Sequence, residues 1–212
     1  MVVFKLTYFD VRGRAEPIRY LFALAGVEYE DKRLTSEEWK KLKPNTPFGG
    51  LPILEVDGKV LGQTQAICRH VAYMHGFFPE NAWDRAQADA ICEKQLEFMV
   101  AIQRAKFESD PAKKETMAKK LKEEDSKTHL TQLQNALKQN NGGKGWFIGN
   151  KISLADVQVF FVLHDQYPAF LGDAVGVVNY LDGFDLLKGF VVRFKAEPKV
   201  AEWLKKRPVN SF

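Results

Sequence analysis

All of the strand-like segments of this 212-residue chain lie within its first 62 residues, and no later segment resembles a strand. Residues 3–9 alternate as a short strand does, and residues 27–34 form a second, weaker one. Between them, apolar residues recur on one helix face up to Gly26, and Pro17 suits the first turn of that helix. Because two strands joined by a helix run parallel, this part of the chain predicts a βαβ unit.

A second pair of strands is predicted over residues 51–62. Two short apolar runs there flank Asp57-Gly58, the dipeptide favoured in type I′ hairpin turns. A helix follows from about Thr64 and ends at Gly76. The N-terminal part is therefore predicted to be a βαβ unit followed by ββα, a small domain over residues 1–78.

Residues 83–212 are predicted to form an all-helical domain, joined to the first by a linker at residues 79–82. After the linker, apolar residues recur only at helical spacing. Helices are expected over Asp84–Glu108, from Asp110-Pro111 to Asn140, from the capping box Ser153–Asp156 onward, and over Pro198–Arg207. The predicted fold class is thus α+β, with two domains.

Composition and charge exclude several classes of protein. A chain that is 45% hydrophobic and 27% charged is typical of a globular protein rather than a disordered one. The net charge is +4, but the lysines between Lys113 and Lys127 alternate with acidic residues, as on a solvated helix face. No run approaches the ~18 apolar residues of a membrane helix, and residues 1–8 lack the apolar core of a signal peptide. We therefore expect a soluble, cytoplasmic protein with neither a nucleic-acid nor a membrane partner.

The cysteines and histidines argue against a disulfide framework and a metal site. Cys68 and Cys92 both lie in helical patterns, and Cys68 is expected to be a small core residue. The 4 histidines show no ligand-like spacing with carboxylates or cysteines. No bound metal is therefore expected.

Several short motifs occur in a fixed order along the chain. They are Leu6-Thr7-Tyr8-Phe9, Arg12-Gly13-Arg14, Pro47-Phe48-Gly49, Leu51-Pro52-Ile53-Leu54, Gln63-Thr64, Trp146-Phe147-Ile148-Gly149, Ser153–Asp156 and Arg207-Pro208. Each motif alone is weak, but the ordered set resembles the sigma-class glutathione transferases over essentially the whole chain. The resemblance implies a thioredoxin-like N-terminal domain that binds glutathione, a helical domain that forms the electrophile pocket and dimer contacts, and a homodimer.

By this resemblance, Tyr8 and Arg14 are the catalytic residues. A phenol at the end of the first strand would donate a hydrogen bond to the glutathione thiolate and lower the pKa of the thiol. Arg14 would lie close to the sulfur, favour its negative charge and orient Tyr8. Without the other motifs, Tyr8 would more often be a plain aromatic residue of a strand, and Arg14 a surface ion-pair former.

The resemblance makes Gly49, Gly50, Leu51 and Pro52 glutathione-binding residues, with the Leu51 backbone at the cysteinyl unit. A cis peptide bond before Pro52 would turn the Leu51 backbone so that its N–H and C=O pair with the peptide. The sequence also allows an ordinary trans proline at the start of a strand. Gly50 stands where many relatives carry a longer polar side chain, so it offers only its backbone.

Other residues are expected to bind the two ends of glutathione. Gln63 and Thr64 open a helix whose free N–H groups would hold the γ-glutamyl carboxylate, although Thr64 also suits a plain helix cap. Trp39 and Lys43, on a predicted short helix, would face the glycine end through an indole N–H and a positive charge. Considered alone, these two residues suit packing and solvent contact.

The resemblance assigns three further residues, two to the electrophile pocket and one to a contact with the second subunit. Phe9 and Arg104 are expected to line the electrophile pocket. Arg104 stands where the prostaglandin D synthase branch has a tryptophan, so a cation replaces a flat apolar wall. Glu97 stands where relatives have an aspartate that reaches the glutathione of the neighbouring subunit, and its extra methylene alters that reach.

The predicted function is conjugation of the glutathione thiolate to hydrophobic electrophiles in detoxification, with glutathione as co-substrate. One alternative is a non-catalytic carrier of haem or other hydrophobic ligands, and another is a glutathione-dependent isomerase that converts prostaglandin H to D. A bare interaction module that binds no glutathione is a further alternative. A thiol–disulfide oxidoreductase is disfavoured, because no cysteine lies just after the first strand and the first one in the chain is Cys68.

Overall fold

A computed structural model describes residues 2–172 and 179–209 of the chain. Contacts between Cα atoms divide it into two compact units, one of Met1–Phe78 with Glu197–Phe212 and the other of Pro79–Ala196. The last helix therefore groups with the N-terminal unit by its contacts, whereas the sequence pattern groups it with the other helices.

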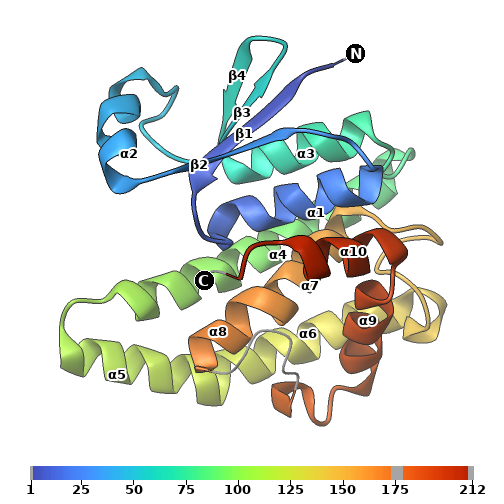
Figure 1. Ribbon diagram of the computed structural model, residues 1–212. Coiled ribbons are helices and arrows are strands. Elements are labelled where there is room, and N and C mark those ends of the chain that lie inside the picture. Colours follow the sequence, from blue (N-terminus) through green and yellow to red (C-terminus); the bar gives the residue numbers. More distant parts are fainter. Residues whose placement is uncertain (1, 173–178, 210–212) are drawn as a thin grey trace. The chain divides into compact units, whose positions relative to one another are not determined.

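The first unit is built on a four-stranded mixed sheet of order β2-β1-β3-β4 (Figure 1). Its strands are β1 (Phe4–Phe9), β2 (Glu30–Leu34), β3 (Ile53–Val56) and β4 (Lys59–Gly62). Strand β1 pairs in parallel with β2 and antiparallel with β3, which pairs antiparallel with β4. The predicted βαβ unit and hairpin are both confirmed.

Local sequence signals account for the turns and helix ends of this unit. Asp57 and Gly58 have φ angles of 47° and 79°, and a type I′ turn requires positive φ at both positions. Helix α1 (Glu16–Ala25) has Pro17 in its first turn and ends at Gly26, whose φ of 65° is a left-handed cap. Helix α2 (Ser36–Leu42) begins with a capping box formed by Thr35 and Glu38.

The remaining helices of the unit pack around α1. Helix α3 (Thr64–Met74) contacts α1, β3 and β4, and α10 (Pro198–Lys206) contacts α1 (Figure 1). The apolar core between these elements is fully buried, and its largest aliphatic members are Leu6, Ile18, Leu21, Leu54, Ile67 and Val71. Phe22 adds aromatic contacts, 5.2 Å from Phe4 and 4.4 Å from Tyr29 between ring centroids. These layers hold β1 rigidly, which matters because the candidate site lies at its end.

The described part of the second unit is helical. Its helices are α4 (Ala82–Phe107), α5 (Pro111–Lys120), α6 (Ser126–Gln139), α7 (Leu154–Phe161), α8 (Tyr167–Leu171) and α9 (Asp185–Lys195). The predicted helix after Asp110 is interrupted only by a π-helical turn at Leu121–Asp125. Helices α8 and α9 were not predicted. None of the helices in the described ranges combines the length and apolarity that a membrane span needs.

A capped helix start organises the core of the second unit. The carboxylate of Asp156, at the start of α7, accepts hydrogen bonds from the backbone N–H groups of Phe147 and Ser153, each at 2.8 Å. The predicted capping box is therefore confirmed. Burial raises the pKa of Asp156 to about 6, although these N–H donors favour its charged form. Phe147 then packs edge-on against Phe190, with ring centroids 5.1 Å apart.

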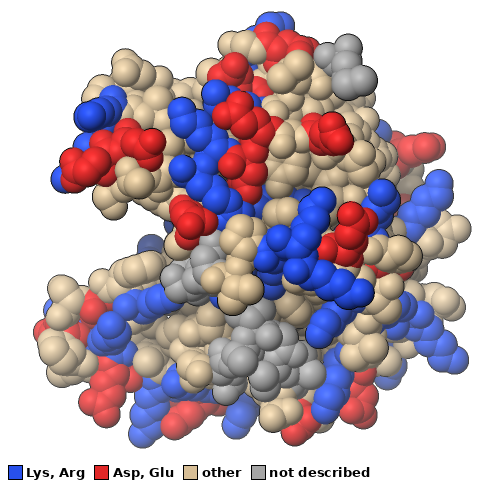
Figure 2. Space-filling model, in the orientation of Figure 1, with Lys and Arg blue, Asp and Glu red and all other residues tan. Residues whose placement is uncertain are grey.

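Charged side chains of both signs are interspersed over the face shown in Figure 2. In the lysine-rich stretch of α5 and the turn after it, Lys120 pairs with Asp125 at 2.6 Å. The outer face of α10 is more basic and exposes Lys199, Lys205 and Lys206. The mixed signs along α5 agree with the solvated helix face predicted there.

His129 is one of two buried histidines of the second unit, the other being His164. The Nε2 atom of His129 lies 3.3 Å from Oε1 of Gln95, and its ring stacks on Phe98 with centroids 4.1 Å apart. Burial, and to a lesser degree the charge of Lys94, lowers the pKa of His129 from 6.5 to about 3. The folded protein therefore holds this histidine neutral where an unfolded chain would protonate it.

Replacing His129 by Gln should flatten the acid dependence of stability. Below pH 6.5 the imidazole of His129 becomes protonated in the unfolded chain, whereas in the folded chain it stays neutral until about pH 3. Stability is thus lost as pH falls, by about 1.4 kcal/mol per pH unit. Over the two pH units below 6.5, the wild type should lose about 2 kcal/mol more free energy of unfolding than His129→Gln. Urea unfolding at a series of pH values measures this, and parallel curves would contradict it.

Candidate active site

The sheet brings the predicted glutathione residues of the first unit to one end. Strand β1 ends at Phe9, and its register pairs Thr7 with Ile53, so residues 49–52 lie beside that end. Ile53 in turn pairs with Gly62, which places residues 63 and 64 at the same end. Phe9 pairs with Leu34 of the parallel strand β2, and α2 follows directly. Segments far apart in sequence therefore converge on the end of β1.

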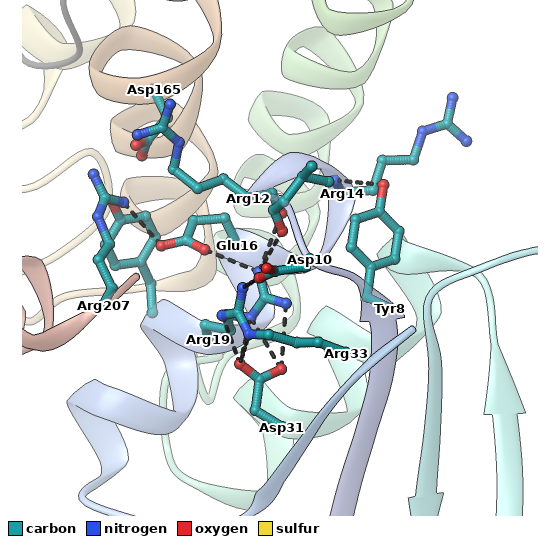
Figure 3. Close-up of polar contacts among 12 residues, drawn as sticks. Tyr8, Asp10, Arg12, Arg14, Glu16, Arg19, Asp31, Arg33, Asp165 and Arg207 are labelled. Carbon is teal, nitrogen blue, oxygen red and sulfur yellow. Dashed lines mark hydrogen bonds and ion pairs between the residues drawn. The ribbon is translucent and has the colours of Figure 1, made fainter. Parts of the chain in front are cut away.

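Tyr8 occupies the centre of this end, on β1, and only 9% of its surface is exposed. Its hydroxyl oxygen accepts a hydrogen bond from the backbone N–H of Arg14 at 3.2 Å (Figure 3). A phenol that accepts through its oxygen still has its own proton to donate. The geometry therefore leaves Tyr8 able to donate a hydrogen bond to a neighbouring anion.

Gly13 is required by the closeness of this contact. Its φ is +41°, and a Cβ atom built on it would lie 2.7 Å from the Tyr8 hydroxyl. Any other residue would push either the ring or the loop away. The Arg12-Gly13-Arg14 motif is therefore a close-packed turn against Tyr8, a 3-10 helix at Gly13–Ala15.

Arg14 contacts Tyr8 differently from the prediction. Arg14 was predicted to favour the charge of the sulfur and to orient Tyr8, whereas the observed contact with Tyr8 is made by its backbone N–H. The side chain is exposed and extends away from the hydroxyl in Figure 3. Its predicted role beside the sulfur stays a prediction.

The segment before β3 has the backbone that the resemblance implies. The peptide bond between Leu51 and Pro52 is cis, which is the form that the resemblance implies and one of the two that the sequence leaves open. Pro52 is buried and Leu51 is half-buried, while Gly49 has a φ of 60°. A Cβ on Gly50 would meet only the backbone oxygen of Phe48, at 3.9 Å, so the absence of a side chain there is not forced by crowding.

Gln63 has a backbone conformation that L-residues rarely adopt, with φ of 74° and ψ of 115°. It is the residue before α3, and its side chain makes no capping hydrogen bond. Thr64 is the first residue inside the helix, so the alternative of a plain cap by Thr64 is wrong. Strained backbone of this kind concentrates at functional sites, here beside a helix N-terminus suited to an anion.

An aromatic cluster links Tyr8 to α2. The ring centroid of Phe9 lies 5.7 Å from that of Tyr8 and 6.1 Å from that of Trp39. Trp39 is half-buried on α2, and Lys43 is exposed in the 3-10 turn that follows it. Phe9 thus presents a half-buried apolar surface next to the candidate catalytic hydroxyl.

The two other predicted residues belong to the second unit. Glu97 and Arg104 are both exposed on α4, and Glu97 pairs with Lys94 of the same helix at 3.0 Å. Their roles at a partner's glutathione and in the electrophile pocket stay predictions. Cys68 is fully buried in α3, as predicted. Within the described ranges, no cluster of three or more His, Cys, Asp or Glu could hold a metal ion.

These features define a class: a thioredoxin-like domain with a tyrosine at the end of its first strand and a helical companion. The family model of the glutathione S-transferase N-terminal domain matches residues 4–73 of this chain. The family model of the glutathione S-transferase C-terminal domain matches residues 97–207. The chain belongs to the glutathione S-transferase family, an enzyme family whose co-substrate is glutathione.

Individual proteins extend the match over the whole chain. The haematopoietic prostaglandin D synthase of Gallus gallus is 37% identical, over 97% of this chain and 96% of its own. The S-crystallin SL11 of Nototodarus sloanii is 34% identical over all of both chains. The crystal structure of the glutathione S-transferase from Ascaris lumbricoides has a TM-score of 0.87 at 32% identity, over 99% of this chain and 100% of its own. These similarities agree with the sigma-like resemblance of the sequence.

Replacing Gly13 by Ala should impair catalysis far more than folding. The new Cβ would press on the Tyr8 hydroxyl, and a misplacement of about 1 Å at a reacting group can cost up to a hundredfold in rate. We expect kcat/KM for glutathione conjugation to fall about tenfold or more. Gly58→Ala is the matched control, because Gly58 also has positive φ but nothing lies within 4 Å of its Cβ position. Steady-state assays should show near wild-type activity for Gly58→Ala, and equal losses in both variants would contradict the steric account.

Proposed function

We propose that this chain conjugates glutathione to hydrophobic electrophiles, with the Tyr8 phenol donating a hydrogen bond to the glutathione thiolate. The observation that carries the proposal is the hydrogen bond from the Arg14 N–H to the Tyr8 oxygen. It fixes the phenol at the end of β1 and leaves the phenolic proton for the sulfur. A donor fixed in this way stabilises the charged form of a thiol and lowers the pKa of that thiol.

Magnitudes show what Tyr8 can contribute. A fall in the thiol pKa from ~8.5 by ~2 units raises the thiolate fraction at pH 7 from about 3% to about 75%. The nucleophilicity of the sulfur falls by about eightfold for a Brønsted slope near 0.45. The net gain is only about threefold, so placing the thiolate against a bound electrophile must supply most of the rate.

The remaining residues would hold the peptide in register with Tyr8. The backbone of Leu51 would pair with the cysteinyl unit, flanked by Gly49, Gly50 and Pro52. The N-terminus of α3 at Gln63 and Thr64 would bind the γ-glutamyl carboxylate, where free N–H groups and the helix dipole favour an anion. The indole N–H of Trp39 and the charge of Lys43 would face the glycine carboxylate. In support, the sheet register gathers these segments at the end of β1.

The electrophile would lie against Phe9, since this ring contacts both Tyr8 and Trp39. An apolar surface with few polar groups selects by hydrophobicity more than by shape, which suits detoxification of varied compounds in the cytoplasm. A homodimer is part of the proposal, with Glu97 reaching the partner. Exposed apolar side chains at Phe48, Val60 and Tyr73 support an interface on the first unit.

A second candidate function is the isomerisation of prostaglandin H to prostaglandin D. The observation that favours it is the 37% identity to a prostaglandin D synthase, against 34% for the S-crystallin. Both reactions would use the same thiolate, so Tyr8 does not distinguish them. Arg104 argues against the isomerase, because it replaces a flat apolar wall by a cation. The carrier alternative is disfavoured by the intact contact between Tyr8 and the Arg14 backbone.

Replacing Tyr8 by Phe tests the leading proposal. The wild type should conjugate 1-chloro-2,4-dinitrobenzene with an apparent thiol pKa about 2 units below that of free glutathione. Tyr8→Phe should lose most of that shift and of the activity near neutral pH, because the thiolate loses its donor. The measurement is the pH dependence of kcat/KM for both proteins. Binding of glutathione without conjugation by the wild type would favour the carrier, and equal profiles would remove Tyr8 from the mechanism.

Product analysis with prostaglandin H tests the second candidate. We expect the wild type to give the same product mixture as buffer with glutathione, and Arg104→Trp to increase the fraction of the D isomer. Arg104→Lys is the matched control, because it keeps a cation on the exposed face of α4. Efficient formation of the D isomer by the wild type would instead make isomerisation the main function.

A further inference from the structure

The first unit contains a fully buried arginine. Arg19, on α1, has 0% of its surface exposed, and a buried charge is tolerated only when it is paired and hydrogen-bonded. Its Nη1 atom donates to the carbonyl oxygens of Val11 at 3.0 Å and Arg12 at 3.3 Å. It also donates to Glu16 at 3.2 Å, and the Nε and Nη2 atoms donate to Asp31 (Figure 3). One side chain thus joins the loop after β1 to α1 and β2.

The two carbonyl groups belong to the loop that contacts Tyr8. Val11 and Arg12 directly precede Gly13 and Arg14, and the Arg14 N–H is the donor to the Tyr8 hydroxyl. Only a short stretch of backbone separates the atoms that Arg19 holds from the atom that orients the phenol. A shift of the loop on one side therefore moves the donor on the other.

The network continues to the last helix of the chain. Glu16 is 1% exposed, and its Oε1 atom accepts from Nε1 of Trp203 at 2.9 Å and from Nη1 of Arg207 at 2.8 Å. Arg207 also donates to the hydroxyl of Tyr20 at 2.9 Å. Trp203 and Arg207, near the end of the chain, thus hold the Glu16 carboxylate that accepts a hydrogen bond from Arg19. All of these contacts lie within the first unit.

The Asp31 carboxylate, the second one that binds Arg19, also accepts hydrogen bonds from another arginine. Asp31 receives two bonds from Arg33, at 3.0 and 2.7 Å, and Arg33 also donates to Asp10 at 2.8 Å. Asp10 lies in the loop just ahead of Val11. The loop after β1 is therefore held at two of its carbonyl groups and at one carboxylate, by arginines on α1 and β2.

We propose that Arg19, supported through Glu16 by Trp203 and Arg207, is a positioning residue that sets the loop of residues 11–14 so that the Arg14 N–H meets the Tyr8 hydroxyl. The C-terminal helix α10 thereby takes part in activating the glutathione thiol. The planar fork of the guanidinium group is suited to this task, since it fixes several acceptors at once, whereas an ammonium is a point donor. This inference rests on the proposed role of Tyr8 as the donor to the thiolate.

The variant Arg207→Met tests the inference at a distance from the substrate. It takes a charged donor from Glu16, and with looser support the loop should hold Tyr8 less well. We expect the apparent pKa of the bound thiol to rise by about half a unit to one unit, and kcat to fall several-fold with little change in the KM for glutathione. Arg207→Lys keeps the charge and should restore most of the thiol pKa. Trp203→Phe, which removes only the indole donor, should give a smaller shift in the same direction.

The control is Lys206→Met, a neighbouring exposed lysine of α10 whose nearest acidic partner, Glu202, is 3.9 Å away. The thiol pKa is read from the ultraviolet absorbance of the bound thiolate against pH, and thermal unfolding is recorded for every variant. Lys206→Met should match the wild type in both. Arg19→Lys and Arg19→Met extend the series where they fold.

The outcomes separate the inference from the proposal beneath it. If Arg207→Met and Trp203→Phe lower the unfolding temperature but leave the thiol pKa at its wild-type value, the network only holds the fold and the inference is wrong. If Tyr8→Phe itself leaves the thiol pKa unchanged, the proposed role of Tyr8 fails instead. A rise in the thiol pKa that Arg207→Lys reverses supports the inference.

Discussion

A guanidinium group with no exposed surface must find its acceptors inside the protein, and the first unit is arranged around that requirement at Arg19. Its donors go to two loop carbonyls and to the carboxylates of Glu16 and Asp31. Each carboxylate also binds a second arginine, Arg207 on Glu16 and Arg33 on Asp31. Removing one member would leave another charge buried and short of a partner. The loop after β1 therefore has one strongly preferred position.

The sheet brings the rest of the candidate site to this loop. Strand β1 is interior, with a parallel neighbour on one side and an antiparallel one on the other. The segment after β2, the segment before β3 and the start of α3 consequently meet at the end of β1. The groups proposed to bind the peptide thus lie at the ends of strands and helices, which hold a site to tighter geometry than long loops do. The cis bond at Pro52 and the positive φ of Gln63 both occur at this end.

Much of the fold could be predicted from short-range signals, because these act within a few residues. Asp57-Gly58 predicted its hairpin, and the Ser153–Asp156 box predicted the start of α7. Helix α9 was missed although its buried residues Leu187, Phe190, Val191 and Phe194 have the spacing of a helix face. The contacts of α10 with the first unit could not be predicted from the sequence, since they run from Trp203 and Arg207 to residues near the start of the chain. A pattern within one helix carries no sign of such distant partners.

In the candidate site, too, the sequence predicts which residues take part better than it predicts how their atoms are placed. The motif Arg12-Gly13-Arg14 could be matched by residue type, and the type of Arg14 suggested a side-chain contact. The contact instead comes from its backbone N–H, which any residue would supply, and depends on the missing Cβ of Gly13 and on the position of the loop. That position is set by Arg19, whose acceptors are scattered along the chain. In the proposed mechanism, lowering the thiol pKa by ~2 units gains only about threefold in rate, so accurate placement of Tyr8 and of the thiolate matters more than ionisation. Sequence motifs therefore give least information about the position of the loop and of the Tyr8 hydroxyl, on which the proposed chemistry depends most.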